Sequence, residues 1–105
     1  MGETQASITQ WAEETFGPCS LSRAADRMIE EMDELMVVNH LHCFSKDYAT
    51  QLREECADIV ITMYRLASLA GFDVHAAVDA KMEVNRRRLW GVKGDGTGYH
   101  ITGVN

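Results

Sequence analysis

The chain has 105 residues, 46% of them hydrophobic, and a formal net charge of −6. This length supports one domain with a modest core, so a subunit interface is expected to supply part of the stability. The acidic balance argues against a protein that binds the nucleic-acid backbone, which requires a basic surface, but it allows a metal ion held between carboxylates and a phosphate ligand.

The first predicted element is a helix over residues 7–16. Ser7 is suited to its N-cap, with Gln10 three positions later, and Gly17 followed by Pro18 ends it. β-branched residues do not alternate with polar ones along the chain, so strands are not expected. The pattern therefore favours an all-α protein.

A second helix is predicted from about Leu21 to Asn39, with Ser20 or Ser22 as its cap. Its apolar residues recur with the 3.6-residue period of a helix that buries one face. They are Leu21, Ala24, Ala25, Met28, Met32, Leu35 and Met36. The segment HLHCFS follows as a connector.

A third helix is predicted to start near Ser45 and to end at Gly71, which suits a left-handed C-cap. A fourth helix is predicted to follow, with Asp73 as its cap, and to end before Gly91. The inward stripes are Leu52, Cys56, Ile59, Met63, Leu66 and Ala70 in the third helix and Val74, Val78, Met82 and Leu89 in the fourth. Residues 91–105 hold five of the eight glycines and no helical period, so a flexible arm is expected there. The predicted fold is an all-α bundle of four to five helices with a glycine-rich C-terminal arm, forming a single domain over residues 1–105.

The remaining composition bears on the compartment. No apolar run approaches the roughly 20 residues that cross a bilayer, and the first residues lack the basic flank and apolar stretch of an export signal. Cys19, Cys43 and Cys56 share no disulfide or metal spacing and are interpreted as reduced thiols. A cytoplasmic protein without a membrane segment is therefore expected.

Acidic residues occupy matching places in the second and third predicted helices. At 100° per residue, Glu31 and Glu34 lie roughly 80° and 140° from the centre of the apolar stripe. Glu55 and Asp58 have about the same offsets in their own helix, so an antiparallel hairpin would bring all four carboxylates to one face. Such a cluster needs a cation, and Mg²⁺ prefers carboxylates, water and phosphate oxygens. The alternative is two ordinary solvated helix faces.

Lys81, Asn85 and Arg88 recur on one face of the fourth helix, at its inward edge. Two cations flanking an amide suit phosphate oxygens, while the alternative is that the cations reach solvent and Asn85 meets a backbone group. Trp11, Phe16 and Trp90 either pack in the core or offer a stacking surface for a base. A zinc site at His40, His42 and Cys43 is disfavoured because a fourth ligand is missing.

These motifs together resemble those of the MazG-like nucleoside triphosphate pyrophosphohydrolases. EEMDE followed by EECAD matches the family pattern E-E-x-x-E … E-x-x-D, and KMEVNRRRLW resembles the K-x-x-x-N-x-x-R segment that follows it. The opening WAEETFGP is similar to the start of the dATP/dGTP pyrophosphohydrolase branch. The resemblance covers roughly residues 8–90, with the motifs in the family's order.

The resemblance implies cleavage of a (d)NTP between the α- and β-phosphates. Mg²⁺, with Mn²⁺ as the alternative, would be bound by Glu31, Glu34, Glu55 and Asp58. Lys81, Asn85 and Arg88 would contact the phosphates or sugar, Trp11 would lie near the base, and Trp90 completes the candidate substrate-binding set. Either Glu30 or Glu34 would take the proton of the attacking water. A homodimer or homotetramer is implied as well.

The expected substrates are the purine deoxynucleotides dATP and dGTP, with dCTP or dUTP as the alternative. A non-catalytic helical protein that binds a partner protein is the rival from another class. The glycine-rich arm lies outside the family's common pattern, and Lys93, Tyr99 and His100 are its candidate contact residues.

Overall fold

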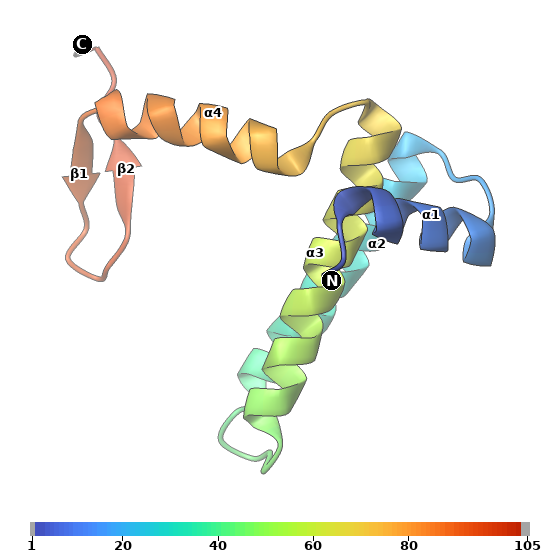
Figure 1. The fold of residues 1–105 in the computed structure, drawn as a ribbon. Helices are drawn as coiled ribbons and strands as arrows, with labels where there is room; N and C mark the ends of the chain where they lie inside the picture. Colours follow the sequence, from blue (N-terminus) through green and yellow to red (C-terminus); the bar gives the residue numbers. More distant parts are fainter. Residues whose placement is uncertain (1, 104–105) are drawn as a thin grey trace. The chain divides into compact units, whose positions relative to one another are not determined.

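The structure is a computed structural model that describes residues 2–103, among which it forms four helices and one short β-hairpin (Figure 1). The elements are α1 (Gln5–Phe16), α2 (Leu21–His40), α3 (Tyr48–Ala70), α4 (Val74–Arg87), β1 (Trp90–Val92) and β2 (Gly98–His100). The chain divides into two compact units, Met1–Val74 and His75–Asn105, which are described separately. Within residues 2–103, no helix combines the length and apolar character needed to cross a membrane. The predicted all-α class is confirmed, apart from the hairpin.

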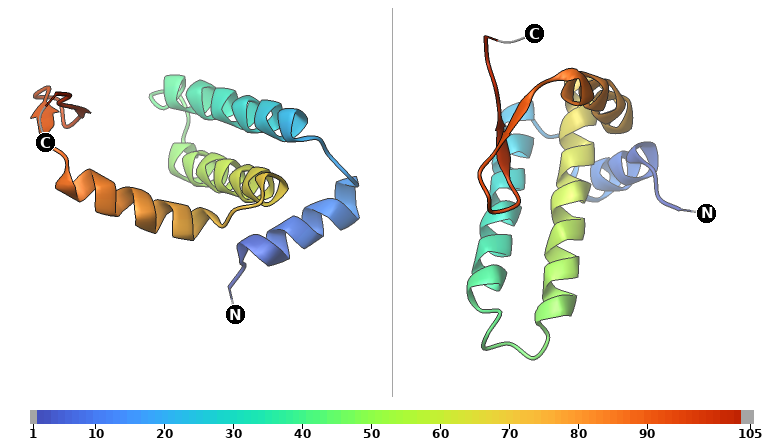
Figure 2. Two further views of the ribbon diagram at one scale, coloured as in Figure 1. Left: turned by 90° about the horizontal axis from the view of Figure 1, so that it is seen from above. Right: turned by 90° about the vertical axis from the view of Figure 1, so that its left-hand side faces the viewer.

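The first unit is built on an antiparallel hairpin of α2 and α3 (Figure 2). At the start of α2, the Ser20 hydroxyl accepts a hydrogen bond from the backbone N–H of Arg23 at 3.1 Å, as an N-cap should. At the end of α3, Gly71 has a φ of 85°, the left-handed conformation predicted for it. The third helix begins at Tyr48 rather than near Ser45, because Ser45 is occupied in a turn, where its hydroxyl accepts from the Asp47 N–H at 3.3 Å.

Helix α1 starts two residues earlier than predicted. Thr4 is its N-cap and Ser7 is the third residue of a capping box, in which each side chain accepts the other residue's N–H. The predicted cap at Ser7 was therefore wrong by three positions. The helix packs on α3, where the Thr9 and Ser68 hydroxyls lie 2.8 Å apart and Gln5 Nε2 donates to the Phe72 carbonyl at 2.8 Å.

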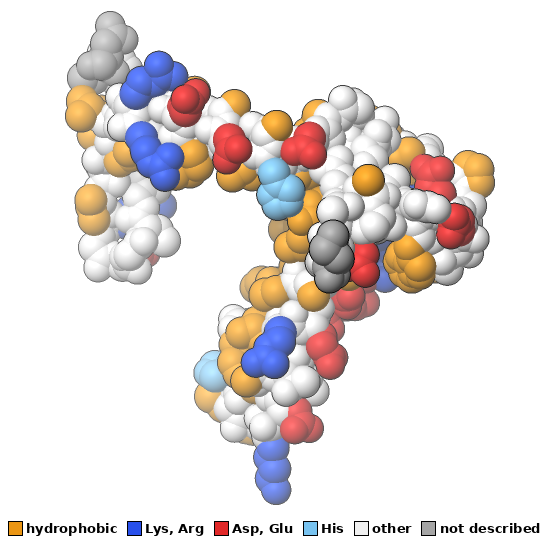
Figure 3. Space-filling view, viewed as in Figure 1, with side chains coloured by type: hydrophobic (Ala, Val, Ile, Leu, Met, Phe, Trp, Pro, Cys, Tyr) orange, Lys and Arg blue, Asp and Glu red, His pale blue; other side chains and the backbone are white. Residues whose placement is uncertain are grey.

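Small residues fill the centre of the first unit. Ala12, Ala24 and Ala67 come from three different helices and are the hydrophobic residues that are buried in the described chain. Several residues of the predicted inward stripes are instead exposed, including Met32 (48%) and Met36 (56%). The reason is that a single hairpin partner covers only part of a wide apolar stripe. Figure 3 shows hydrophobic side chains gathered along one side of the α2–α3 hairpin and acidic side chains along the other.

The second unit contains α4 and the β-hairpin, which corrects the prediction of an arm without strands. β1 and β2 pair antiparallel, with Trp90 opposite His100 and Gly91 opposite Tyr99. A Cβ at position 91 would collide with the Tyr99 ring, so glycine there lets the ring lie over the partner strand. The turn is closed by Asp95, whose carboxylate accepts from the Thr97 N–H at 2.9 Å. The arm was also expected to include residues 104–105, which lie outside the described residues.

Candidate metal and nucleotide site

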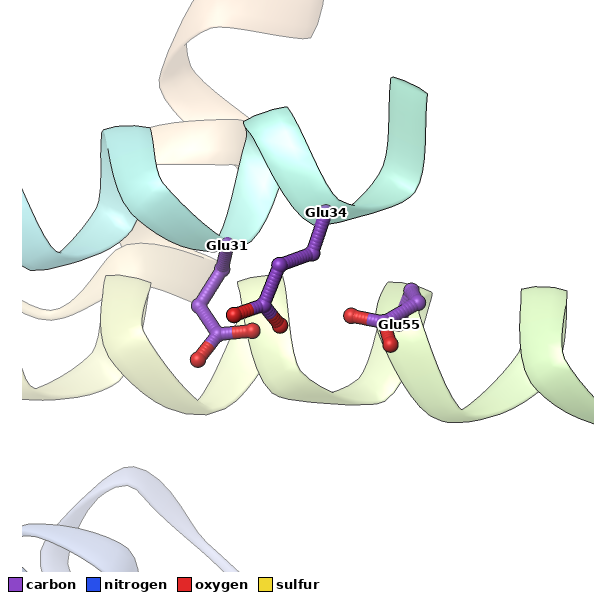
Figure 4. Close-up of side chains that lie close together, drawn as sticks. All are labelled: Glu31, Glu34 and Glu55. Carbon is purple, nitrogen blue, oxygen red and sulfur yellow. The ribbon is translucent and has the colours of Figure 1, made fainter. Parts of the chain in front are cut away.

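Carboxylates from α2 and α3 meet in the first unit. Glu31 and Glu34 extend from α2 toward α3, where the carboxylate of Glu55 faces them (Figure 4). One oxygen from each of these three residues lies within 4.8 Å of the other two. Asp58, the fourth predicted carboxylate, is close enough for its charge to raise the pKa of both Glu31 and Glu55. The helical offsets read from the sequence thus correspond to a real convergence of side chains.

The electrostatics of this cluster are unfavourable without a cation. Glu31 is 4% exposed, and its burial, followed by a hydrogen bond with Glu34, raises its pKa. Removal from water, followed by the charge of Glu34, also raises the pKa of Glu55. Within residues 2–103, the Oε2 atoms of Glu31 and Glu55 are buried and have no hydrogen-bond partner. Buried oxygens left in this state are suited to a hard divalent cation.

Glu30 is directed to a different set of partners. Its two oxygens accept from Nη1 of Arg23 and Nη1 of Arg27, each at 3.1 Å. The hydrogen bond from Arg23 lowers the pKa of Glu30 below its ordinary value. Arg27 also forms an ion pair with Glu31. The structure therefore brings Glu34, and not Glu30, into the carboxylate cluster.

A cavity of ≈ 530 Å³ adjoins the cluster. Its volume lies in the range of small-molecule sites, which is about 300–1,000 Å³. The lining combines acids, cations and aromatic rings: Glu31, Asp58, Arg23, Arg27, Arg65, Trp11 and Phe16 belong to it. The two aromatic rings meet edge to face, with their centroids 5.4 Å apart. Carboxylates, guanidinium groups and a stacking surface are the chemical groups that a nucleotide with its metal ion requires.

The three arginines of the cavity were missed in the sequence. Arg23 and Arg27 lie eight and four residues before Glu31, which places them on the same face of α2. Arg65 follows Asp58 by seven residues on α3. Helical spacing from the acidic residues would have identified all three as neighbours of the predicted site.

The predicted residues of the second unit run from the middle of α4, at Lys81, to Trp90 at the start of β1. Lys81 is exposed, and Asn85 and Arg88 are half-buried. The backbone carbonyl of Asn85 accepts from the Trp90 indole N–H at 2.7 Å, and the Oδ1 atom of Asn85 is buried without a partner in the described chain. The rings of Trp90 and His100 are 5.8 Å apart across the β-hairpin, which also contains Tyr99, with Lys93 directly after β1.

The histidines and cysteine of the α2–α3 connector interact locally. His42 Nδ1 is 2.7 Å from the Asn39 carbonyl oxygen, and Cys43 Sγ is 3.2 Å from His42 Nε2. In the described part of the chain, the group of residues whose geometry suits a metal ion is Glu31, Glu34 and Glu55, and the connector residues do not belong to it.

An antiparallel helical hairpin with facing carboxylates beside a cationic and aromatic cavity defines an all-α protein equipped for a divalent metal and an anionic ligand. The family model described as the MazG-like family matches residues 24–102. The chain belongs to the MazG-like family.

Two relatives named dATP/dGTP diphosphohydrolase are similar to this chain. The protein of Salmonella phage PMBT28 is 32% identical over 101 residues, which are 96% of this chain and 31% of that protein. The protein of Cyanophage S-2L is 30% identical over 103 residues, which are 98% of this chain and 90% of that protein. This chain thus spans about a third of the first relative and most of the second.

A solved structure also has a similar fold. It is described as the Cyanophage S-2L MazG-like pyrophosphohydrolase bound to dGDP and three catalytic Mn²⁺ ions per active site. The TM-score is 0.70, the sequence identity is 30%, and the likeness covers 92% of each chain.

Proposed function

We propose that this chain is a nucleoside triphosphate pyrophosphohydrolase that cleaves a (d)NTP between the α- and β-phosphates, giving a (d)NMP and pyrophosphate. The observation that carries the proposal is the cluster of Glu31, Glu34 and Glu55 adjoining a cavity lined by arginines and aromatic rings. The names of the two phage relatives support purine deoxynucleotides, dATP and dGTP, as substrates.

We assign the metal site to four carboxylates: Glu31, Glu34, Glu55 and Asp58. The buried Oε2 atoms of Glu31 and Glu55, which have no hydrogen-bond partner in the part of the chain that the structure describes, support this assignment. A divalent ion is also supported by the Mn²⁺ ions of the similar cyanophage structure, and we propose Mg²⁺ as the physiological ion with Mn²⁺ as a substitute. When bound, such an ion would neutralise triphosphate charge and lower the pKa of a coordinated water.

Glu34 is the better of the two predicted general bases. It is exposed, and one of its carboxylate oxygens lies within 4.8 Å of oxygens of Glu31 and Glu55, so it can reach a water held there. Glu30 has a lowered pKa and both of its oxygens are engaged by arginines, which makes it a weaker proton acceptor. We assign Glu30 the role of orienting Arg23 and Arg27 in the cavity.

The proposed substrate-binding residues are given for each unit by itself. In the first unit, Trp11 offers its ring to the base, and Arg23 and Arg27 offer guanidinium groups to phosphate oxygens. In the second unit, the proposed contacts to phosphates or sugar are Lys81, Asn85, Arg88 and Trp90. The Oδ1 atom of Asn85 is buried and has no hydrogen-bond partner among residues 2–103, which supports a role in binding a polar ligand group. The family match spans residues of both units, which supports one functional domain over residues 1–105.

We also infer a homodimer or homotetramer. Only Ala12, Ala24 and Ala67 are buried hydrophobic residues in the described chain, and large apolar side chains such as Ile29, Met36 and Val60 are about half exposed. A chain with so small a core needs further burial for stability, and a second copy would supply it. The free thiols of Cys19, Cys43 and Cys56 support a reducing compartment, the cytoplasm, and the net charge of −6 argues against a nucleic-acid partner.

The test is a survey of the four ribonucleotides and four deoxynucleotides with Mg²⁺ or Mn²⁺. Phosphate is measured after addition of inorganic pyrophosphatase, and mass spectrometry identifies the nucleotide product. The Glu31→Gln variant should be inactive, while Asp33→Asn, an exposed acid of the same helix, should retain activity. Phosphate release that does not need the pyrophosphatase would contradict α–β cleavage. Higher activity on dCTP or dUTP would overturn the purine assignment, and no product from any nucleotide would overturn the enzyme.

A further inference from the structure

The motif TFGP ends α1 and continues into the wall of the cavity. Phe16, Gly17 and Pro18, with the next two residues, line it, and residues 16–20 are called the cavity loop here. Phe16 is 67% exposed, so packing of its side chain does not hold it in place. Trp11 and Phe16 both belong to α1, so the placement of their rings against the cavity depends on how the end of this helix and the following residues of the cavity loop are held.

That backbone is held by a hydrogen bond from far along the chain. Nη2 of Arg65, on α3, donates to the carbonyl oxygen of Gly17, and the bond is part-buried. The N–H of the same glycine donates to the Glu13 carbonyl at 2.9 Å, so both polar groups of Gly17 are fixed, one by α1 and the other by α3. Gly17 has φ 82° and ψ −173°, a conformation that only glycine adopts readily, and Pro18 restricts the next φ angle.

We propose that Arg65 is a positioning residue that fixes the cavity loop as the base-binding wall and so gives the site its preference for purines. This inference rests on the proposed function. Arg65 lies two helical turns, about 10 Å, beyond Asp58 on the same rigid helix, a span comparable with that from the phosphates of a nucleotide to its base. One helix thus sets the distance between the carboxylate cluster and the aromatic wall.

An unsatisfied hydrogen-bond donor on the Arg65 side chain supports this role. Its Nε atom is buried and has no hydrogen-bond partner within the described residues, although a guanidinium group normally satisfies its donors. A charged donor to a carbonyl forms a stronger hydrogen bond than a neutral one, which suits a contact that must hold a short loop in one orientation. A purine offers more ring area for stacking than a pyrimidine, so purine binding depends more on the placement of Phe16 against Trp11.

The experiment compares Arg65→Ala, Arg65→Lys and Gly17→Ala with the wild type. Arg53→Ala is the matched control, because Arg53 is an exposed arginine of α3 that does not line the cavity. KM and kcat are measured for dGTP, dATP and dCTP with Mg²⁺, and the affinity for dGMP is measured by calorimetry. Circular dichroism and thermal melting with and without Mg²⁺ report on folding and on the carboxylate cluster.

The expected result for Arg65→Ala is a KM for dGTP raised about 10-fold or more, with kcat changed less than about 3-fold. The ratio of kcat/KM for dGTP to that for dCTP should fall at least about 5-fold, while the stabilisation by Mg²⁺ persists. Arg65→Lys should restore part of the loss. Gly17→Ala should raise the KM for dGTP and lower the dGTP-to-dCTP ratio of kcat/KM, as Arg65→Ala does. Arg53→Ala should change neither quantity. An unchanged KM, or an equal loss for purines and pyrimidines, would overturn the inference.

Two outcomes separate this inference from its premises. If Arg65→Ala does not fold, Gly17→Ala decides the question, because it keeps Arg65 and alters only the loop backbone: a raised KM for dGTP with a lowered ratio of dGTP to dCTP supports the inference, and no change in either overturns it. If the wild type hydrolyses no nucleotide, the proposed function fails, while the affinity of each variant for dGMP relative to that of the wild type still decides whether Arg65 positions the wall.

Discussion

Glu31 of α2 and Glu55 of α3 each present a carboxylate oxygen to the same small region, within 4.8 Å of each other and of an oxygen of Glu34. Each of the two also keeps one buried oxygen without a hydrogen-bond partner in the described chain. Like charges at this separation destabilise the fold unless a proton or a cation is shared among them. The stability of the folded protein should therefore depend on both pH and divalent metal.

The first prediction concerns pH without metal. Burial raises the pKa of Glu31 in the fold above its unfolded value, so the folded protein binds more protons than the unfolded one in the interval between the two pKa values. Stability is then greatest below the unfolded pKa, near 4.3, and falls as the pH rises through the folded pKa. In EDTA the wild type should melt at a lower temperature at pH 8 than at pH 5.

Two variants isolate this effect. Glu31→Gln removes the titrating group and should reduce the decrease in melting temperature between pH 5 and pH 8, and it should melt above the wild type at pH 8. Asp33→Asn removes an exposed acid from the same helix and should keep the wild-type pH dependence. A wild type that becomes more stable as the pH rises would show that the Arg27 ion pair, rather than burial, dominates at Glu31.

The second prediction concerns the metal. A ligand that binds only the folded state stabilises it by RT ln(1 + [L]/Kd), which is about 2.7 kcal/mol at 100 times Kd. Millimolar Mg²⁺ or Mn²⁺ should therefore raise the melting temperature of the wild type by several degrees. Glu55→Gln removes one carboxylate of the cluster and should lose most of this shift. An equal shift in wild type and variant would place the metal elsewhere.

The convergence of the acids could be predicted because it depends on local rules. A helix repeats every 3.6 residues, and a two-helix hairpin relates its arms by approximate symmetry, so the offsets of Glu31, Glu34 and Glu55 determine where they meet. The same local rules offered Ser20 or Ser22 as the cap of α2 and Gly71 as the cap of α3, and the structure has Ser20 and Gly71 in these positions.

Other features depend on contacts between distant segments. The bond from Arg65 to Gly17 joins residues 48 positions apart, and no local pattern indicates it. The β-hairpin was missed because its strands have three residues each and lack an alternating pattern, and because the fit of Tyr99 against Gly91 appears only when the strands are paired. The exposure of Met36 could not be foreseen either, since the sequence marks a side chain as apolar without showing whether its own chain or a second copy covers it.

The third prediction tests the β-hairpin. Gly91→Ala would place a Cβ against the Tyr99 ring, so the half-exposed ring would have to move off the partner strand, and the hairpin should become less stable. Hydrogen exchange at the amides of Lys93 and Ile101, which donate to Thr97 and Leu89 across the hairpin, should accelerate accordingly. Val92→Ala alters a side chain that is 80% exposed and serves as the control. Unchanged protection in Gly91→Ala would contradict the pairing register.

The fourth prediction concerns the exposed apolar side chains of α2. If a second copy covers them, Met36→Asp places a charge in an interface, and burial of an unpaired charge is strongly unfavourable. Light scattering should show a smaller oligomer for this variant than for the wild type at the same concentration. Asp33→Asn should leave the mass unchanged. A wild type that is monomeric at tens of micromolar would rule out the proposed dimer or tetramer.

The fifth prediction separates the two glutamates that the sequence offered as general bases. Glu34→Gln removes a carboxylate from the cluster and should lower kcat by at least about 100-fold, the usual size of a general-base effect. Glu30→Gln leaves the cluster intact and loosens Arg23 and Arg27, so it should raise KM while kcat falls less than about 5-fold. The two variants therefore differ in which kinetic parameter changes, and measurement of both parameters for dGTP distinguishes them. If Glu30→Gln instead loses kcat and flattens the acidic limb of the pH–rate profile, Glu30 takes the proton and Glu34 serves the metal alone.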